Sequence, residues 1–348
     1  MTGRAPEATD ALPRIDALSQ LRVDEDGTVH VPAMAVPVSP YLSAEGRRWM
    51  IEHLHQNQSP ELQRRVEGNP VLLQRYLDRT RELFPTTFEE VRLGGVRAYD
   101  YRPADGVPAH NQNRVLIELH AGAFHEGWPS CAELQSTPIC SLGRVRVVAV
   151  NYRKAPEHSF PAASEDVAAV YQALLETYPA ENIGIFGCSA GGQLAAMATA
   201  WLQAHDLPRP GAIGIYSAGA TQNGPGDAAY TAAPIGEAMP PPQPADGRAG
   251  RGPGGYLAKA DRRDPLVSPA VSDEVLSKFP PTQVITGTRH FDLSAAVYTH
   301  TRLVKLGVEA ELHVWEGLFH FFFLNPDVPE SRDAYDVMVR FFDRRLGR

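Results

Sequence analysis

IGIFGCSAGGQLAA, residues 183–196, is the stretch that decides the fold. An apolar run is followed by the pattern G-x-S-x-G and then by an alanine-rich segment typical of a helix. A serine on such a sharp turn between strand and helix is exposed and unhindered, as a nucleophile must be. We therefore predict that Ser189 is a nucleophile. The alternative is a plain strand-to-helix turn without chemistry.

The composition favours a soluble globular protein. The chain has 348 residues, 43% hydrophobic and 21% charged, with a net charge of −8 and no long basic run. This balance argues against nucleic acid and anionic membranes as partners. Residues 1–20 lack a signal-peptide core, no apolar stretch reaches the ~20 residues of a membrane span, and the three cysteines show no C-x-x-C spacing. We expect a cytoplasmic protein.

The chain divides into two parts in the sequence. Residues 1–90 are expected to form an N-terminal arm and cap helices, with helix starts at Ser59-Pro60 and Asn69-Pro70. Residues 91–348 are expected to form a catalytic domain in which short apolar strands alternate with helices, which indicates a mainly parallel sheet covered on both faces. The expected strands are an antiparallel pair within 91–101 and the segments 115–119, 145–150, 183–186, 212–216, 283–286 and 309–315. Helices are expected at 162–178 and 332–346 and after the strands at 183–186 and 283–286.

One segment breaks this alternation. Residues 221–258 are rich in proline and glycine and follow the sixth strand. Their composition argues against a long helix. A mobile lid over the carboxyl edge of the sheet and a disordered surface insertion both remain open.

A second loop carries groups that suit acyl transfer. Residues 120–124, HAGAF, directly follow a strand. The backbone N–H groups of Gly122 and Ala123, with that of Ala190 after the serine, are expected to form an oxyanion hole. His320 follows the last strand, and a nucleophile first with a histidine last is the chain order of α/β-hydrolases.

These motifs together resemble the bacterial hormone-sensitive-lipase-like family of carboxylesterases. The likeness covers roughly residues 90 to 348 and rests on five motifs in the family's order. They lie at residues 120–124, 152–163, 187–192, 264–269 and 287–289.

The resemblance implies an α/β-hydrolase fold whose cap is built from the N-terminal helices and the insertion after strand six. It also implies hydrolysis of small, short-acyl esters by Ser189 with His320 as base, without a cofactor. A homodimer is left open, as is the natural substrate.

The departures from the family pattern matter as much as the matches. The family's triad aspartate follows G-T-R, where this chain has His290, and the nearest carboxylate is Asp292. We predict that Asp292 orients His320; a triad without an acid, or with Glu316 or Glu126, is the alternative. His290 could accept a hydrogen bond from His320 but supplies no negative charge. A lost triad would favour a different function, either binding of a small apolar ligand or a non-hydrolytic elimination or acyl transfer.

Other side chains near the expected site have simpler explanations. His120, His290 and Phe124 are expected to line the site. Four histidines could converge on a zinc ion, but family roles already explain two of them, so no metal is expected. Cys188 stands where the family has aspartate and is expected to be a small buried thiol.

Overall fold

The computed structural model describes residues 21–58, 65–66, 69–222, 226–242 and 255–347. The chain forms two units, Met1–Pro37 and Val38–Arg348. In the first unit β1 (Arg22–Val23) pairs antiparallel with β2 (Val29–His30). The second unit contains the sheet and the helices discussed below. None of the described helices is both long and apolar enough to cross a bilayer.

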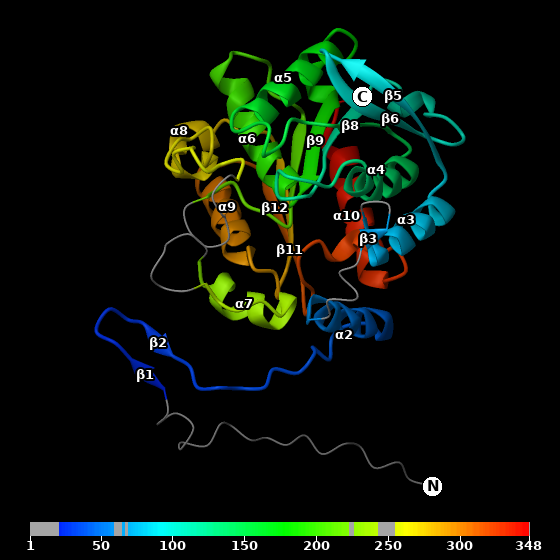
Figure 1. The fold of residues 1–348 in the computed structure, drawn as a ribbon. Helices are drawn as coiled ribbons and strands as arrows, with labels where there is room; N and C mark the ends of the chain where they lie inside the picture. The colour runs from blue at the N-terminus through cyan, green and yellow to red at the C-terminus, as the bar shows by residue number, and fades with distance from the viewer. Residues whose placement is uncertain (1–20, 59–64, 67–68, 223–225, 243–254, 348) are drawn as a thin grey trace. The chain divides into compact units, whose positions relative to one another are not determined.

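A single large sheet is the framework of the second unit, with eight strands within the described residues (Figure 1). In sheet order these are β12 (Ala310–Trp315), β11 (Thr282–Gly287), β10 (Ala212–Tyr216), β9 (Ile183–Cys188), β7 (Val115–Leu119), β8 (Arg146–Val150), β6 (Val96–Pro103) and β5 (Thr86–Leu93). The strands from β12 to β8 in this order are parallel, whereas β6 and β5 are antiparallel to their neighbours. The carboxyl ends of the parallel strands therefore meet at one edge. A separate short pair joins β3 (Arg65–Val66) to β4 (Asn69–Pro70).

Helices cover both faces of this sheet. Those that pack on it are α4 (Ser130–Gly143), α5 (Ala162–Leu175), α6 (Ala190–Ala204), α9 (Leu293–Lys305) and α10 (Pro329–Arg345). The other helices of the described residues are α2 (Ala44–Gln58), α3 (Val71–Leu83), α7 (Ala228–Glu237) and α8 (Asp273–Leu276), which pack mainly on neighbouring helices. Helices α5, α6 and α9 share one apolar core with one face, and α4 and α10 share another with the opposite face (Figure 1). Strand β7 shows why: Ile117 faces the first core and Leu116 the second, and both are fully buried or nearly so. Apolar residues on both faces are what a parallel strand between two helix layers requires.

Most expected strands and helices are confirmed. The expected pair within 91–101 is the hairpin of β5 and β6, whose start at Thr86 precedes the expected domain boundary. Helix α3 begins directly after Asn69-Pro70, as expected. Helix α2 was not expected, because its residues are largely polar, and α4 was missed as well. The helix expected to start at Ser59-Pro60 falls on residues 59–64, outside the described residues.

The proline- and glycine-rich insertion contains a helix. Within residues 221–258, α7 buries four alanines against the body of the unit and tolerates Pro234. Residues 243–254 lie outside the described residues. In Figure 1 α7 lies beside α2, which it contacts.

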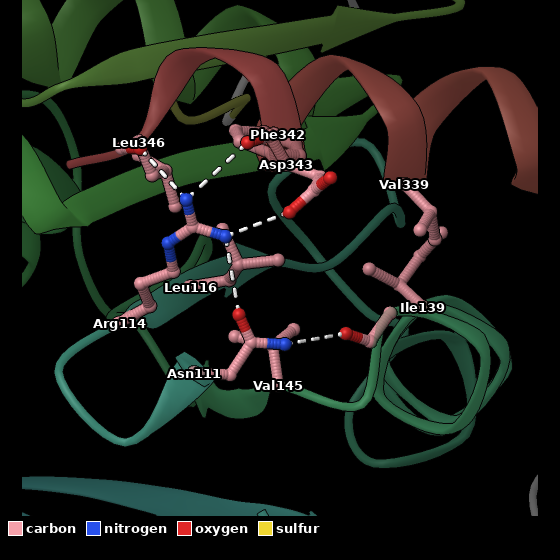
Figure 2. Close-up of a pocket in the computed structure, with 10 residues that line it drawn as sticks. Asn111, Arg114, Leu116, Ile139, Val145, Val339, Phe342, Asp343 and Leu346 are labelled. Carbon is pink, nitrogen blue, oxygen red and sulfur yellow. Dashed lines mark hydrogen bonds and ion pairs between the residues drawn. The ribbon is translucent and has the colours of Figure 1, made fainter. Parts of the chain in front are cut away.

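The amino edge of the sheet holds a small pocket that is remote from the predicted site (Figure 2). Arg114, just before β7, is 3% exposed, and its guanidinium donates five hydrogen bonds. Its acceptors are the carbonyl oxygens of Asp343, Leu346 and Gly347 and the side chains of Asn111 and Asp343. This arginine ties the start of β7 to the end of α10, which is a structural role.

Candidate active site

Ser189 stands between β9 and α6 in a strained backbone conformation. Its φ is 58° and its ψ −122°, a region that non-glycine residues rarely adopt and that costs about 1–3 kcal/mol. Its backbone N–H donates to the carbonyl oxygen of Tyr216 at 2.8 Å, which ties the turn to the end of β10. The side chain is partly exposed. The turn therefore presents the hydroxyl at the carboxyl edge of the sheet.

The glycines beside the serine permit a close approach of two chain segments. A Cβ on Gly191 would lie 1.7 Å from the carbonyl oxygen of Leu119, and one on Gly187 would lie 2.4 Å from the same oxygen. No larger residue fits at either place. The start of α6 is thereby held against the end of β7, with the helix N-terminus directed at the serine turn.

The loop after β7 is a tight turn with three consecutive residues at positive φ. Gly122, Ala123 and Phe124 have φ values of 132°, 54° and 59°. The carbonyl oxygen of Gly122 accepts hydrogen bonds from the N–H groups of His125 and Glu126, each at 2.9 Å. Ala123 still has its backbone N–H donor. Its left-handed backbone conformation costs about 1 kcal/mol, because a residue with a Cβ is crowded there. Alanine at this position therefore leaves the loop geometry intact.

Two rings expected to line the site are stacked on tyrosine rings. His120 is fully buried and stacks on Tyr152 at a centroid distance of 4.2 Å, and Tyr152 Oη donates to the carbonyl oxygen of His120 at 2.6 Å. Burial lowers the pKa of His120 to about 3, which keeps its ring neutral. Phe124 is 3% exposed and stacks on Tyr256. Packing takes both rings almost entirely away from solvent, and the expectation that they line the site stays a prediction.

His320 lies at the same edge as Ser189. The next residue, Phe321, donates its backbone N–H to Ser217 Oγ at 3.1 Å, and Ser217 directly follows β10. The carbonyl of the preceding residue, Tyr216, is the acceptor for the Ser189 N–H. The end of β10 therefore anchors both the predicted nucleophile and the predicted base.

The ring of His320 is held by a second histidine. His320 Nδ1 lies 2.7 Å from His290 Nε2, and His290 Nδ1 lies 3.0 Å from Thr286 Oγ1. The arrangement is satisfied when His320 carries its proton on Nδ1 and His290 on Nδ1, so that each ring donates to the next group. His320 Nε2 then has a free lone pair, which is the tautomer of a general base.

Both rings are neutral near pH 7. Burial, and then the neighbouring His320, hold the pKa of His290 well below its usual range. Burial lowers the pKa of His320 to about 4, the carboxylate of Glu237 acts in the opposite direction, and His53 adds a smaller lowering. The neighbour of His320 at Nδ1 is therefore uncharged.

The expectation that Asp292 orients His320 differs from what the structure shows. A ring nitrogen makes one in-plane hydrogen bond, and His290 occupies that position on Nδ1. Asp292 precedes α9 as its N-cap residue. His290 itself is fully buried and touches the ring of His320, and its expected place in the lining of the site stays a prediction.

The remaining expectations concern a thiol and a metal. Cys188 is buried, and burial raises its pKa well above the usual value, which leaves the thiol unreactive. The direct contact of His290 with His320 leaves no space for an ion between these two rings. In the part of the chain that the structure describes, no three side chains of metal-binding type cluster together.

One charged group at the site was missed by the sequence analysis. Glu237, the last residue of α7, accepts a hydrogen bond from the backbone N–H of His320 at 2.9 Å. Its other oxygen lies 2.8 Å from His53 Nε2 of α2. No motif surrounds Glu237, and it lies in an insertion whose composition indicated a lid or a disordered loop, so the sequence held no signal for it.

Comparison with known proteins identifies the family. Residues 116–324 match the profile of the α/β hydrolase fold family. The chain belongs to this family. An acetyl-hydrolase of Streptomyces hygroscopicus is 31% identical over 69% of this chain and 79% of that protein. The carboxylesterase/phospholipase LipF of Mycobacterium tuberculosis is 32% identical over 73% of this chain and 66% of that protein.

Solved structures agree with these relatives. Esterase E25 superposes with a TM-score of 0.74 at 27% identity and covers 91% of this chain and 99% of its own. An esterase from the bacterial hormone-sensitive lipase family has a TM-score of 0.73 at 26% identity and covers 90% of this chain and 100% of its own. This α/β hydrolase is a carboxylesterase of the hormone-sensitive-lipase type, which confirms the resemblance seen in its motifs.

Proposed function

We propose that the protein hydrolyses short-acyl esters through an acyl-enzyme formed on Ser189. His320 Nε2 accepts the proton of Ser189 as the hydroxyl oxygen attacks the ester carbonyl, and the backbone N–H groups of Gly122, Ala123 and Ala190 bind the oxyanion. His320 then gives the proton to the leaving alcohol. A water molecule attacks the acyl-enzyme in the second half of the reaction, with His320 again as base. The strained turn that holds Ser189 is the observation that carries the proposal.

His290 supports only part of the usual task of a triad acid. An acid in that place fixes the tautomer of the base and stabilises the imidazolium. An amide there loses about 10⁴ in rate in the serine-protease template, where it selects the wrong tautomer. His290 differs from an amide, because its Nε2 can only accept a hydrogen bond from His320 Nδ1–H while its own Nδ1–H donates to Thr286 Oγ1. The tautomer is thereby kept, and the charge at Nδ1 is lost.

A small acyl group fits the proposed site best. Ala123 adds an exposed methyl to the proposed oxyanion loop, and we infer that this methyl narrows the approach to Ser189. The names of two relatives, an acetyl-hydrolase and an ethyl acetate hydrolase of Pseudomonas putida, point to the same acyl size. We therefore infer that acetyl esters are turned over faster than esters of longer acids.

Labelling and turnover test this function together. A fluorophosphonate probe should label the wild type, and p-nitrophenyl acetate should be hydrolysed faster than p-nitrophenyl octanoate. Ser189→Ala should abolish labelling and leave less than about 1% of the rate. Ser277→Ala, an exposed serine at the end of α8, is the control and should behave like wild type. A wild type that neither reacts with the probe nor turns over any short ester would instead support a ligand-binding or non-hydrolytic function.

A further inference from the structure

Glu237, at the end of α7 in the insertion, contacts both helix α2 and the loop of His320. Its side chain is nearly buried, with 8% of the residue exposed. Oε1 accepts from the backbone N–H of His320 at 2.9 Å, and Oε2 lies 2.8 Å from His53 Nε2. One carboxylate thus contacts the residue of the predicted base and a residue of α2.

Helix α2 holds Glu237 in place through further contacts. Asn57, one turn after His53, donates its side-chain N–H to the carbonyl oxygen of Glu237 at 3.0 Å. The ring of His53 stacks on Phe319 at a centroid distance of 3.6 Å, directly before His320. The position of Glu237 is therefore set by contacts on both sides.

The other groups that face His320 do not supply the negative charge of a triad carboxylate. His290 is neutral, and Phe291 presents only its ring, at a centroid distance of 4.7 Å. Arg289 donates to the carbonyl oxygen of Ile235, and its own charge faces Glu316. His53 shares the carboxylate of Glu237. Among the residues that the structure describes, Glu237 is thus the carboxylate whose negative charge acts on His320.

We propose that Glu237 is a positioning residue that stabilises the His320 imidazolium in place of the charge missing at position 290. The inference rests on the proposed function, because it needs His320 to gain a proton during catalysis. The carboxylate acts from the backbone side of His320, not through Nδ1. The cap therefore supplies part of the catalytic electrostatics, through α7 and α2.

The electrostatic balance at His320 agrees with this role. Burial lowers the pKa of His320 to about 4, and the negative charge of Glu237 opposes that lowering. Removing the charge should lower this pKa further. Loosening the packing should do the reverse, because water admitted to the ring relieves the desolvation. The two effects have opposite signs and can be separated.

A double-mutant cycle tests the role in catalysis. Glu237→Gln should lower kcat/KM for p-nitrophenyl acetate about tenfold to hundredfold in the wild type, mainly through kcat. In a His290→Asp background, where Nδ1 again faces a carboxylate, the same change should cost less than about threefold. An equal loss in both backgrounds would show a merely structural role and overturn the proposal. Glu237→Asp, which keeps the charge, should retain more activity than Glu237→Gln and serves if the amide variant folds poorly.

The titration of His320 gives a readout that does not need turnover. NMR of the ring nitrogens should show a lower His320 pKa in Glu237→Gln than in the wild type, and the acid limb of kcat/KM should move to lower pH. An unchanged or raised pKa would contradict the proposal even if Ser189 labels normally. Conversely, if Ser189 is not labelled but the His320 pKa is lowered in Glu237→Gln, only the proposed function is contradicted.

Glu330→Gln is the matched control. Glu330 also clamps α2, by accepting from the backbone N–H and Oγ of Ser43 at 2.6 and 2.8 Å, but it contacts α2 at its other end and belongs to α10. It should change neither the His320 pKa nor kcat/KM. An effect as large as that of Glu237→Gln would mean that loosening α2 is sufficient, and would sink the proposal.

Discussion

His290 accepts a hydrogen bond from His320 but, as a neutral ring, supplies no negative charge. In the family that this chain resembles, the same position holds an aspartate, which performs both tasks. Thr286 Oγ1 lies 3.0 Å from Nδ1 of the buried His290 ring and holds it in place. The replacement of aspartate by histidine therefore comes with a polar partner for the new ring. Orientation and charge are thereby assigned to different residues.

Substitutions at positions 290 and 292 distinguish whether His290 or Asp292 orients His320. His290→Asp should raise kcat/KM at least about tenfold, because a carboxylate then stabilises the imidazolium directly. His290→Glu covers the case in which the shorter aspartate does not reach His320 Nδ1. Asp292→Asn should change kcat/KM less than about threefold. A loss of several orders of magnitude in Asp292→Asn would show that Asp292, not His290, orients the working base.

The proposed nucleophile and base could be predicted from the sequence, because local motifs mark their positions. Ser189 was predictable from the apolar run before it and the helix after it, and His320 from its place after the last strand. The change at His290 was visible because Gly287 to Arg289 mark the position. The contact of Glu237 with His320 joins residues 83 positions apart, in a segment without a motif, and only tertiary packing reveals it.

At the scale of elements, α7 changes how the insertion is understood. Composition suggested a lid or a disordered loop, but α7 buries alanines and approaches the loop after β11 closely. A Cβ on Gly236 would lie 1.9 Å from the carbonyl oxygen of Arg289. The helix is therefore a packed part of the site.

Hydrogen exchange and one substitution check this packing. Backbone amides in the second half of α7 should exchange more slowly than those of an open loop, though faster than those of β9, which is fully buried. Gly236→Ala should speed exchange in α7 and lower kcat/KM, because it forces α7 and Glu237 away from the His320 loop. Gly143→Ala, where the new Cβ would meet side chains at 3.3 Å or more, is the control and should leave both unchanged. Unprotected α7 amides in the wild type would contradict the packed helix.

Strands were easier to predict than helices for a physical reason. Strands β7 and β10 lie between two helix layers, so every residue is buried and the segments read as short apolar runs. Helix α2 covers the molecule from outside and buries few residues, so its sequence has little apolar periodicity. Amphipathic patterns report burial, and elements that bury little are poorly predicted by them.

At the scale of the whole molecule, the two edges of the sheet have different tasks. The carboxyl edge carries Ser189 and His320 on strained or loop backbone. The amino edge carries Arg114, whose five hydrogen bonds join the start of β7 to the end of α10. We expect stability and catalysis to be separable between these edges.

Substitution of Arg114 tests this separation. Arg114→Lys keeps the charge but removes the planar fork, so several buried carbonyl groups lose their donor. The free energy of unfolding from urea titration should fall by about 2–3 kcal/mol, whereas kcat/KM of the folded protein at 25 °C should stay within about twofold. Arg340→Lys is the control: Arg340 lies on the same helix, pairs with Asp336 and is exposed, so its exchange should leave stability nearly unchanged. If Arg114→Lys instead lowered kcat/KM with little loss of stability, the amino edge would be coupled to the site through the strands themselves, and the two edges would not act independently.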